Sequence, residues 1–270
     1  MSKAKVAVRR LICLFLIYSL LLCLGGCNSM VERPDSMTKP SETDSDIPVG
    51  AETDPSHSHK RVAITFDDGP NHYDDRTKKV VDELDKYGYR ATFFVVGDRI
   101  PGGDALAYAV EKGNEIGIHG YTHSVYYDTC SEDEYRQELN KTEQAIRKQL
   151  PGYQINLMRP VGGRITEERA KTTPYSIILW SVDSADWENK YYAGISDEEA
   201  DARVACIVDN VMSSVSDGDI ILLHDIYEST YDATKIILKR LYEEGYEVVT
   251  VSELLGDDLQ KGAIYSSAYD

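Results

Sequence analysis

From residue 60 onward, short apolar runs alternate with segments whose apolar residues have helical spacing. The short runs are mostly rich in Val, Ile, Leu, Phe or Tyr, which is typical of β-strands. Seven strands are therefore predicted, at residues 62–66, 91–97, 115–118, 155–158, 176–182, 219–223 and 246–251. Helices are predicted between them, at residues 76–87, 104–112, 132–149, 166–171, 197–215 and 232–244.

Two of the predicted helices begin with a capping-box pattern, Ser131 with Glu134 and Ser196 with Glu199. Continuous apolar strands that alternate with helices indicate a mostly parallel sheet that is buried on both faces. Seven strands in about 195 residues predict a single-domain α/β fold, a distorted (β/α) barrel with about seven parallel strands. An open, doubly wound sheet is the alternative architecture.

The N-terminal segment has the layout of an export signal. Lys3, Lys5, Arg9 and Arg10 form a basic start, and residues 11–24 are almost wholly apolar. The small residues before Cys27 resemble a bacterial lipobox, so residues 1–27 are predicted to be a lipoprotein signal, with Cys27 as the acylated first residue of the mature chain. The apolar run is shorter than the ~20 residues that span a bilayer comfortably, and an uncleaved anchor is the alternative. Both interpretations place the domain outside the cytoplasm, attached to a membrane.

The rest of the chain divides by composition. Residues 28–59 are rich in Ser, Thr, Pro, Asp and Glu, which predicts a disordered linker. The predicted catalytic domain spans residues 60–258, and residues 259–270 are interpreted as a tail. We expect Cys130 and Cys206 to remain small buried thiols, although export would permit a disulfide.

The formal net charge of −17 restricts the partners of the protein. So acidic a chain is a poor match for nucleic acid or anionic polymers, because bulk repulsion opposes both. A neutral carbohydrate, or a small neutral group on a polymer, is compatible with this charge. We expect a monomer that binds no nucleic acid.

Polar residues follow five of the predicted strands at the same end. They are Asp67 and Asp68; His119 and His123; residues 159–163; Asp183, Asp186 and Trp187; and His224 and Asp225. Barrels of this class build their sites at the carboxyl ends of the strands. Chance would distribute polar residues over both ends, so this convergence predicts an active site.

Several of these residues have the chemistry of an open metal site. His119 and His123 are four residues apart, and one aspartate of the Asp67–Asp68 pair would complete a three-ligand set with free coordination positions. Nitrogen and oxygen ligands favour zinc or another first-row divalent ion. The second aspartate would then act as a base, and His224 as an acid for a leaving group. Two histidines and a carboxylate also describe iron(II) oxygenases, but the alternation of helices and strands argues against their usual all-β scaffolds.

From Lys60 to Leu255 the chain resembles the polysaccharide deacetylases with a NodB homology domain, carbohydrate esterase family 4. Residues 65–70 (Thr-Phe-Asp-Asp-Gly-Pro) match the first of five family motifs, which occur in order. The resemblance implies that Asp67 is the catalytic base, and that Asp68, His119 and His123 bind the metal. Gly120 replaces the family's usual Ser or Thr, whose hydrogen bond braces the loop between the two histidines.

The remaining motifs imply further roles. Arg159 would pair with Asp67 and keep it ionised, and Asp186 would keep His224 protonated as the general acid. Gly162 replaces the common aromatic residue of the third motif, although its N–H would still serve the oxyanion. Two residues would contact the substrate: Trp187 as a wall of the groove and Leu222 against the acetyl methyl group.

The implied activity is hydrolysis of N-acetyl groups on a cell-wall or surface polysaccharide, with N-acetylglucosamine of peptidoglycan as the favoured substrate. The implied cofactor is one divalent ion, with zinc favoured over cobalt, nickel, iron or manganese. An O-acetyl esterase that acts on xylan or another glycan is one alternative. A non-catalytic carbohydrate-binding lipoprotein is an alternative of another class.

Overall fold

The computed structural model describes residues 60–191, 195–256 and 259–269. The predicted signal (1–27), the lipidation site Cys27 and the predicted linker (28–59) lie outside the described residues and stay predictions. No helix within the described ranges combines the length and the apolar character that crossing a bilayer requires.

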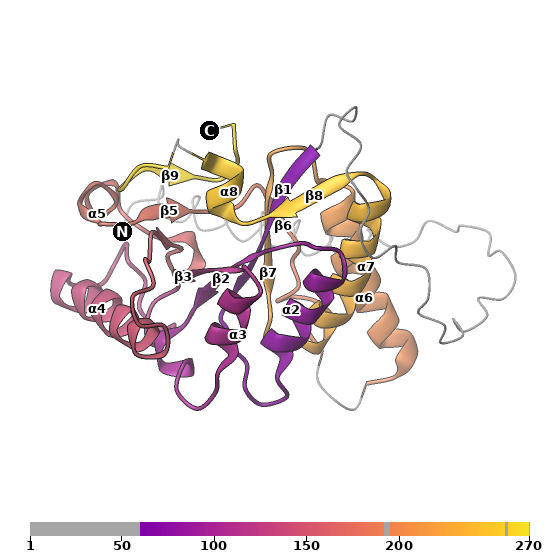
Figure 1. Ribbon diagram of the computed structural model, residues 1–270, viewed down its shortest axis with the longest axis horizontal. Coiled ribbons are helices and arrows are strands. Elements are labelled where there is room, and N and C mark those ends of the chain that lie inside the picture. Colours follow the sequence, from indigo (N-terminus) through magenta and orange to yellow (C-terminus); the bar gives the residue numbers. More distant parts are fainter. Residues whose placement is uncertain (1–59, 192–194, 257–258, 270) are drawn as a thin grey trace, which may run out of the picture. The chain divides into compact units, whose positions relative to one another are not determined.

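One parallel sheet forms the centre of the domain (Figure 1). Its nine strands in the described residues are β1 (Lys60–Asp67), β2 (Thr92–Val95), β3 (Glu115–Ile118), β4 (Leu157–Met158), β5 (Ser176–Ile178), β6 (Val182–Asp183), β7 (Ile220–His224), β8 (Tyr246–Val249) and β9 (Ile264–Tyr265). Their order is β6-β7-β1-β2-β3-β4-β5-β9, and β8 pairs with the first half of β1. The sheet curls into a half-barrel, which confirms the predicted α/β fold.

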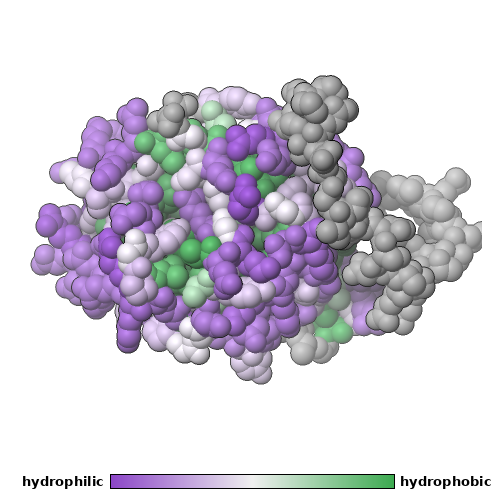
Figure 2. Space-filling model, in the orientation of Figure 1, coloured by the Kyte–Doolittle hydropathy of each residue, from purple (hydrophilic) through white to green (hydrophobic). Residues whose placement is uncertain are grey.

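Helices surround the half-barrel (Figure 1). They are α2 (Arg76–Lys86), α3 (Ala105–Glu111), α4 (Glu132–Gln149), α5 (Glu167–Thr172), α6 (Asp197–Met212), α7 (Glu228–Glu243) and α8 (Val251–Leu255), with 3-10 turns η1 (Gly97–Arg99) and η2 (Val161–Gly163). Neighbouring helices pack in the order α6-α7-α2-α3-α4, which follows the order of the strands they cover. The face shown in Figure 2 is largely hydrophilic, in keeping with the acidic composition.

The alternation of side chains along β1 separates the core from the site. Val62, Ile64 and Phe66 point into the main apolar cluster beneath the helices, and the Phe66 ring stacks on a neighbouring ring of β2 with centroids 5.1 Å apart. Successive side chains of a strand point to opposite faces. Thr65 and Asp67 therefore face the inside of the half-barrel, where both are buried.

The predicted strand at 176–182 is two strands, because the chain crosses there from one edge of the sheet to the other. The Leu179 N–H donates to Tyr265 O in β9, whereas the Ser181 N–H donates to Ile220 O at the start of β7. The segment after the predicted domain boundary at residue 258 also contributes to the sheet, since Ile264 pairs with Ile177 of β5.

The structure also tests the two predicted capping boxes and the predicted state of the cysteines. The capping box of Ser131 and Glu134 is confirmed. At α6 only half of the predicted box forms: Ser196 accepts from the Glu199 N–H, but the Glu199 carboxylate accepts from Arg203 instead. No disulfide joins the two cysteines of the described ranges, Cys130 and Cys206, which are half-buried thiols.

Candidate active site

Three candidate ligands converge at the carboxyl ends of β1 and β3. One atom each from Asp68, His119 and His123 lie within 4.8 Å of one another. His123 Nε2 is 2.8 Å from Asp68 Oδ1, and His119 Nε2 is 3.5 Å from the same oxygen. Although it is so close to His123, this buried oxygen has no well-directed hydrogen bond among the described residues. The donor set therefore fits a divalent metal ion.

Each candidate ligand is oriented by its surroundings. His119 Nδ1 lies 2.9 Å from Arg159 O, and because a carbonyl only accepts, the proton is on Nδ1 and Nε2 is left for a metal. Burial lowers the pKa of His119, although the nearby aspartates act against this shift, so the neutral, ligating form is favoured. Burial acts to raise the pKa of Asp68, but the contact with His123 and the other nearby histidines hold it well below its usual range.

Two of these ligands also have left-handed backbone conformations, Asp68 with φ 75° and His123 with φ 59°. Non-glycine residues adopt this region at a cost of about 1–3 kcal/mol each, and they cluster at functional sites. Arg99 stabilises the first of these conformations, because its Nη1 donates to Asp68 O at 2.6 Å.

Asp67 is held by a fully buried arginine. Arg159 Nη1 donates to Asp67 Oδ1 at 2.8 Å and to Thr65 Oγ1 at 2.7 Å, while its other nitrogens donate to the carbonyls of Ile178 and Leu179. Removing one member of such a buried pair costs about 3–5 kcal/mol. This arrangement leaves Asp67 Oδ2 free of the arginine, 3.6 Å from His119 Nε2.

A second polar pair lies beside the first. His224 is the direct neighbour of Asp67 in the register of β7 and β1. Asp186, which is fully buried, accepts from His224 Nδ1 and from the His224 N–H at 2.7 Å each, and from Thr230 Oγ1 at 2.7 Å. Burial acts to lower the pKa of His224, but the Asp186 charge and hydrogen bond outweigh it and raise the pKa to about 9. The ring is therefore protonated at neutral pH.

The predicted substrate-contacting residues lie around these pairs. Leu222 is buried on β7, where it pairs in register with Thr65 and precedes His224 by two positions, so both side chains are on the same face. Gly162 lies in η2 with φ 62°, and Trp187 is 47% exposed directly after Asp186. All these residues come together at one end of the sheet, as the strand pattern predicted.

Sequence reasoning missed Glu138 of α4, which braces the loop between the two histidines. Its Oε2 accepts from the Tyr121 N–H at 2.6 Å and the Thr122 N–H at 3.0 Å, and its Oε1 accepts from Thr122 Oγ1 at 3.1 Å. A Cβ on Gly120 would lie 3.3 Å from this carboxylate, so Glu138 lies beside the position where the family's Ser or Thr side chain would begin. A signal existed, because Glu138 is a charged residue in the buried stripe of α4.

The sequence identifies Asp225 only as a strand-end residue, but in the structure it stabilises the turn that follows Asp67 and Asp68. Its carboxylate accepts from Thr77 Oγ1, which in turn accepts from the Asn71 N–H at 2.8 Å. A Cβ at Gly69 would lie 2.6 Å from Asp225 Oδ1, which explains the glycine of the motif. Burial raises the pKa of Asp225 to about 7.

The fold and the site together define a β/α half-barrel with a candidate metal centre at its mouth. The sequence model described as polysaccharide deacetylase matches residues 54–175. The peptidoglycan-N-acetylglucosamine deacetylase of Bacillus cereus is 35% identical over 74% of this chain and 90% of the relative. The chain therefore belongs to the polysaccharide deacetylase family, which confirms the resemblance read from its motifs.

Other relatives show the breadth of the family. The peptidoglycan-N-acetylmuramic acid deacetylase PdaC of Bacillus subtilis is 36% identical over 80% of this chain, but the match spans only 43% of the relative. A solved structure of PdaC is similar with a TM-score of 0.64, at 38% identity over 73% of this chain and 90% of that one. A family 4 acetyl xylan esterase from Clostridium thermocellum, solved in complex with a cobalt ion, also has a TM-score of 0.64, at 32% identity over 77% of this chain and 98% of that one.

Proposed function

We propose that this protein is a metal-dependent deacetylase that hydrolyses N-acetyl groups of peptidoglycan, at N-acetylglucosamine residues. The observation that carries the proposal is the pairing in register of Asp67 with His224, next to the cluster of Asp68, His119 and His123. The residues proposed as base, acid and metal ligands would thus be adjacent at one end of the sheet.

Asp68, His119 and His123 would hold the cation, with zinc favoured by the mixed nitrogen and oxygen donors. When bound, such an ion supplies Lewis acidity, which polarises an acyl carbonyl and makes water more acidic.

The protein's own groups divide the proton transfers between them. Asp67 takes a proton from the attacking water through Oδ2, because Arg159 occupies Oδ1. As the water oxygen bonds to the acetyl carbon, the Gly162 N–H donates to the developing oxyanion. His224 then donates the proton on Nε2 to the amide nitrogen, the C–N bond breaks, and acetate and a free amine are the products.

Two residues would fix the substrate during these steps. Leu222 packs against the acetyl methyl group from inside the half-barrel, where it is buried. Trp187, at 47% exposure, forms one wall of the groove.

The similarity to an acetyl xylan esterase supports O-acetyl ester hydrolysis as a second candidate activity. The intact base, acid and ligand positions count against a binding protein without activity. The discriminating experiment measures acetate release from peptidoglycan sacculi, chitin oligomers and acetylated xylan, with chelator and with added divalent ions. Mass spectrometry of muramidase fragments then locates the free amine.

We expect chelator-sensitive acetate release from peptidoglycan, with the amine on glucosamine. Free amines on muramic acid alone would contradict the proposed sugar. Acetate from xylan alone would favour the esterase, and glycan binding without acetate release from any substrate would contradict enzymatic function.

For location, we extend the proposal to a lipid anchor at Cys27 that holds the domain at the outer side of the cell membrane. Relatives named for peptidoglycan deacetylation support action at the cell envelope. Growth with a labelled fatty acid should label the wild-type protein and leave Cys27→Ala unlabelled. Membrane-bound wild-type protein without label would instead favour the uncleaved anchor.

A further inference from the structure

Tyr126 lies beside the place left open by Gly162. A Cβ built on Gly162 would meet Tyr126 Cε1 at 3.6 Å, an ordinary van der Waals contact. The ring therefore lies directly against the point at which the family's aromatic side chain would start. It is 41% exposed, so part of the ring faces solvent.

A cation holds the Tyr126 ring in place. The guanidinium carbon of Arg164 lies 4.3 Å from the ring centroid, a cation–π contact that covers one face of the ring. Arg164 is itself fixed, since its Nε donates to Asp128 Oδ2 at 2.9 Å. One face of the ring is thus covered, and the remainder is open to a ligand.

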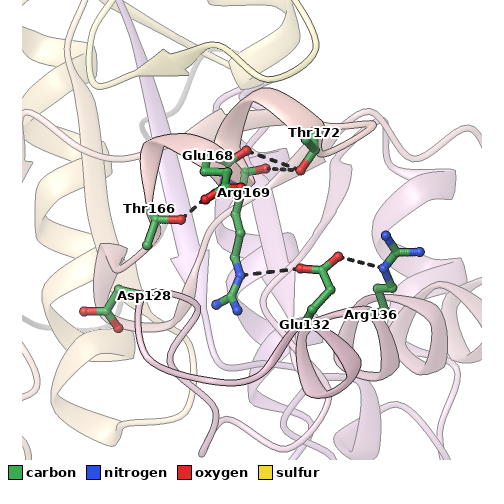
Figure 3. Close-up of a pocket in the computed structure, with 7 residues that line it drawn as sticks. All are labelled: Asp128, Glu132, Arg136, Thr166, Glu168, Arg169 and Thr172. Atoms are coloured by element: carbon green, nitrogen blue, oxygen red, sulfur yellow. Dashed lines mark hydrogen bonds and ion pairs between the residues drawn. The ribbon is translucent and has the colours of Figure 1, made fainter.

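The loop that carries Tyr126 is anchored on its other side as well. Arg169 donates to Tyr127 O and Cys130 O, and Tyr127 forms a β-bridge with Ile165. Figure 3 shows Arg169 reaching from α5 towards Glu132 at the start of α4, and Asp128 lines the same pocket. The loop therefore holds its aromatic side chain in a preformed position, which reduces the entropic cost of binding a ligand.

We propose that Tyr126 supplies the aromatic wall that Gly162 lacks, and that its open face stacks on a pyranose ring of the glycan bound at the site. This inference rests on the proposed function. An aromatic ring offers a flat apolar surface to the C–H face of a sugar, and the phenol adds a polar tip at its edge. By this stacking, Tyr126, which follows His123 by three residues, would act as a specificity-determining residue for the sugar.

The test compares Tyr126→Ala and Tyr126→Phe with the matched control Tyr242→Ala, which removes a ring of similar exposure (37%) from the end of α7. The probes are the N-acetylglucosamine tetramer, followed by acetate release and by direct binding, and 4-nitrophenyl acetate, which has no sugar. We expect Tyr126→Ala to raise KM and Kd for the tetramer about tenfold, with kcat and the 4-nitrophenyl acetate rate within about twofold of wild type. Tyr126→Phe and the control should remain near wild type.

A general structural defect would lower both rates together and would overturn the inference, as would a KM for the tetramer that Tyr126→Ala leaves unchanged. If the wild-type protein releases no acetate from any glycan, the proposed function fails. Binding then decides the inference separately: weaker tetramer binding by Tyr126→Ala supports the wall, and equal or absent binding contradicts it.

Discussion

The floor and the rim of the site differ in how strongly each residue is constrained. The floor comprises Asp67, Asp68, His119, Arg159 and Asp186, all at most 5% exposed. Each of these side chains has charged or polar partners, and a buried charge that loses its partner is strongly destabilising. The rim comprises Gly162, Tyr126 and Trp187, where exposure is high or the side chain is missing. The floor residues match the family motifs, and at the rim Trp187 also follows its motif, whereas Gly162 departs from the third motif. Packing and charge therefore constrain the floor more strongly than the rim, and the departure from the family lies at the rim.

The largest effect is expected at the floor, from Asp68→Ala. Loss of the carboxylate leaves two imidazoles to hold the cation, so metal content and turnover should fall together. The rate should drop about 10³-fold or more, since a bound cation lowers the barrier by several kcal/mol. Metal analysis and acetate release measure both quantities. The control Asp98→Ala removes an exposed aspartate next to Arg99 and should retain both metal and activity. A metal-loaded, active Asp68→Ala protein would contradict the ligand set.

The next effect concerns the pair of Asp186 and His224. Because the pKa of His224 is raised to about 9, the ring is protonated below that pH, and activity should fall as the pH rises through about 9. Asp186→Asn removes the charge that raises this pKa, so the alkaline limb should move towards the ordinary histidine value of about 6.5 or lower. The rate at pH 8 should fall about 10²-fold.

The pH profile of kcat/KM measures this shift. Asp183→Asn, an exposed aspartate of the same motif, is the matched control and should leave the limb in place. An alkaline limb at the same pH in Asp186→Asn would show that another group supplies the proton. The same linkage makes the pair's contribution to stability present below about pH 6.5 and lost as the pH rises through 9.

A smaller effect is expected from replacing Glu138, which braces the loop between His119 and His123. Glu138→Gln keeps the size of the side chain but loses the charged acceptor for the loop between the histidines. Groups that orient metal ligands typically change metal affinity about 10–100-fold when they are replaced. Metal titration should therefore show weaker binding, and saturating metal should restore most of the activity.

Asp133→Asn, an exposed acid on the same helix, controls for the change in charge. Wild-type metal affinity in Glu138→Gln would mean that the loop keeps its geometry without the charged carboxylate. The floor would then not depend on its supporting residues in the way we infer.

Much of the barrel and of the floor could be predicted from the sequence, for a physical reason. Continuous apolar strands fix where each strand ends, and parallel strands bring those ends to one side. The polar residues after five strands were therefore expected to meet, and Asp67 and His224 lie side by side in the sheet. The start of α4 could also be predicted, because its capping box is formed by Ser131 and Glu134, which are only three residues apart.

The features that were missed depend on contacts between distant segments. Residues 176–182 have one continuous apolar pattern, but after Ile178 the chain crosses from one edge of the sheet to the other. At this point Arg159 donates hydrogen bonds to the carbonyls of Ile178 and Leu179. β9 has only two residues, too few for a periodic pattern. The contact between Tyr126 and the space at Gly162 joins two loops that the sequence separates, so no local pattern reveals it.

The most direct test of the floor is Asp67→Asn, measured for metal content and acetate release in one preparation. Asparagine has nearly the same shape, and its side-chain oxygen can still accept from Arg159, so the cation should stay while the base is lost. We expect about one divalent ion per chain, as in wild type, with acetate release reduced about 10²–10⁴-fold. Acetate release near the wild-type rate from the metal-loaded variant would contradict the account.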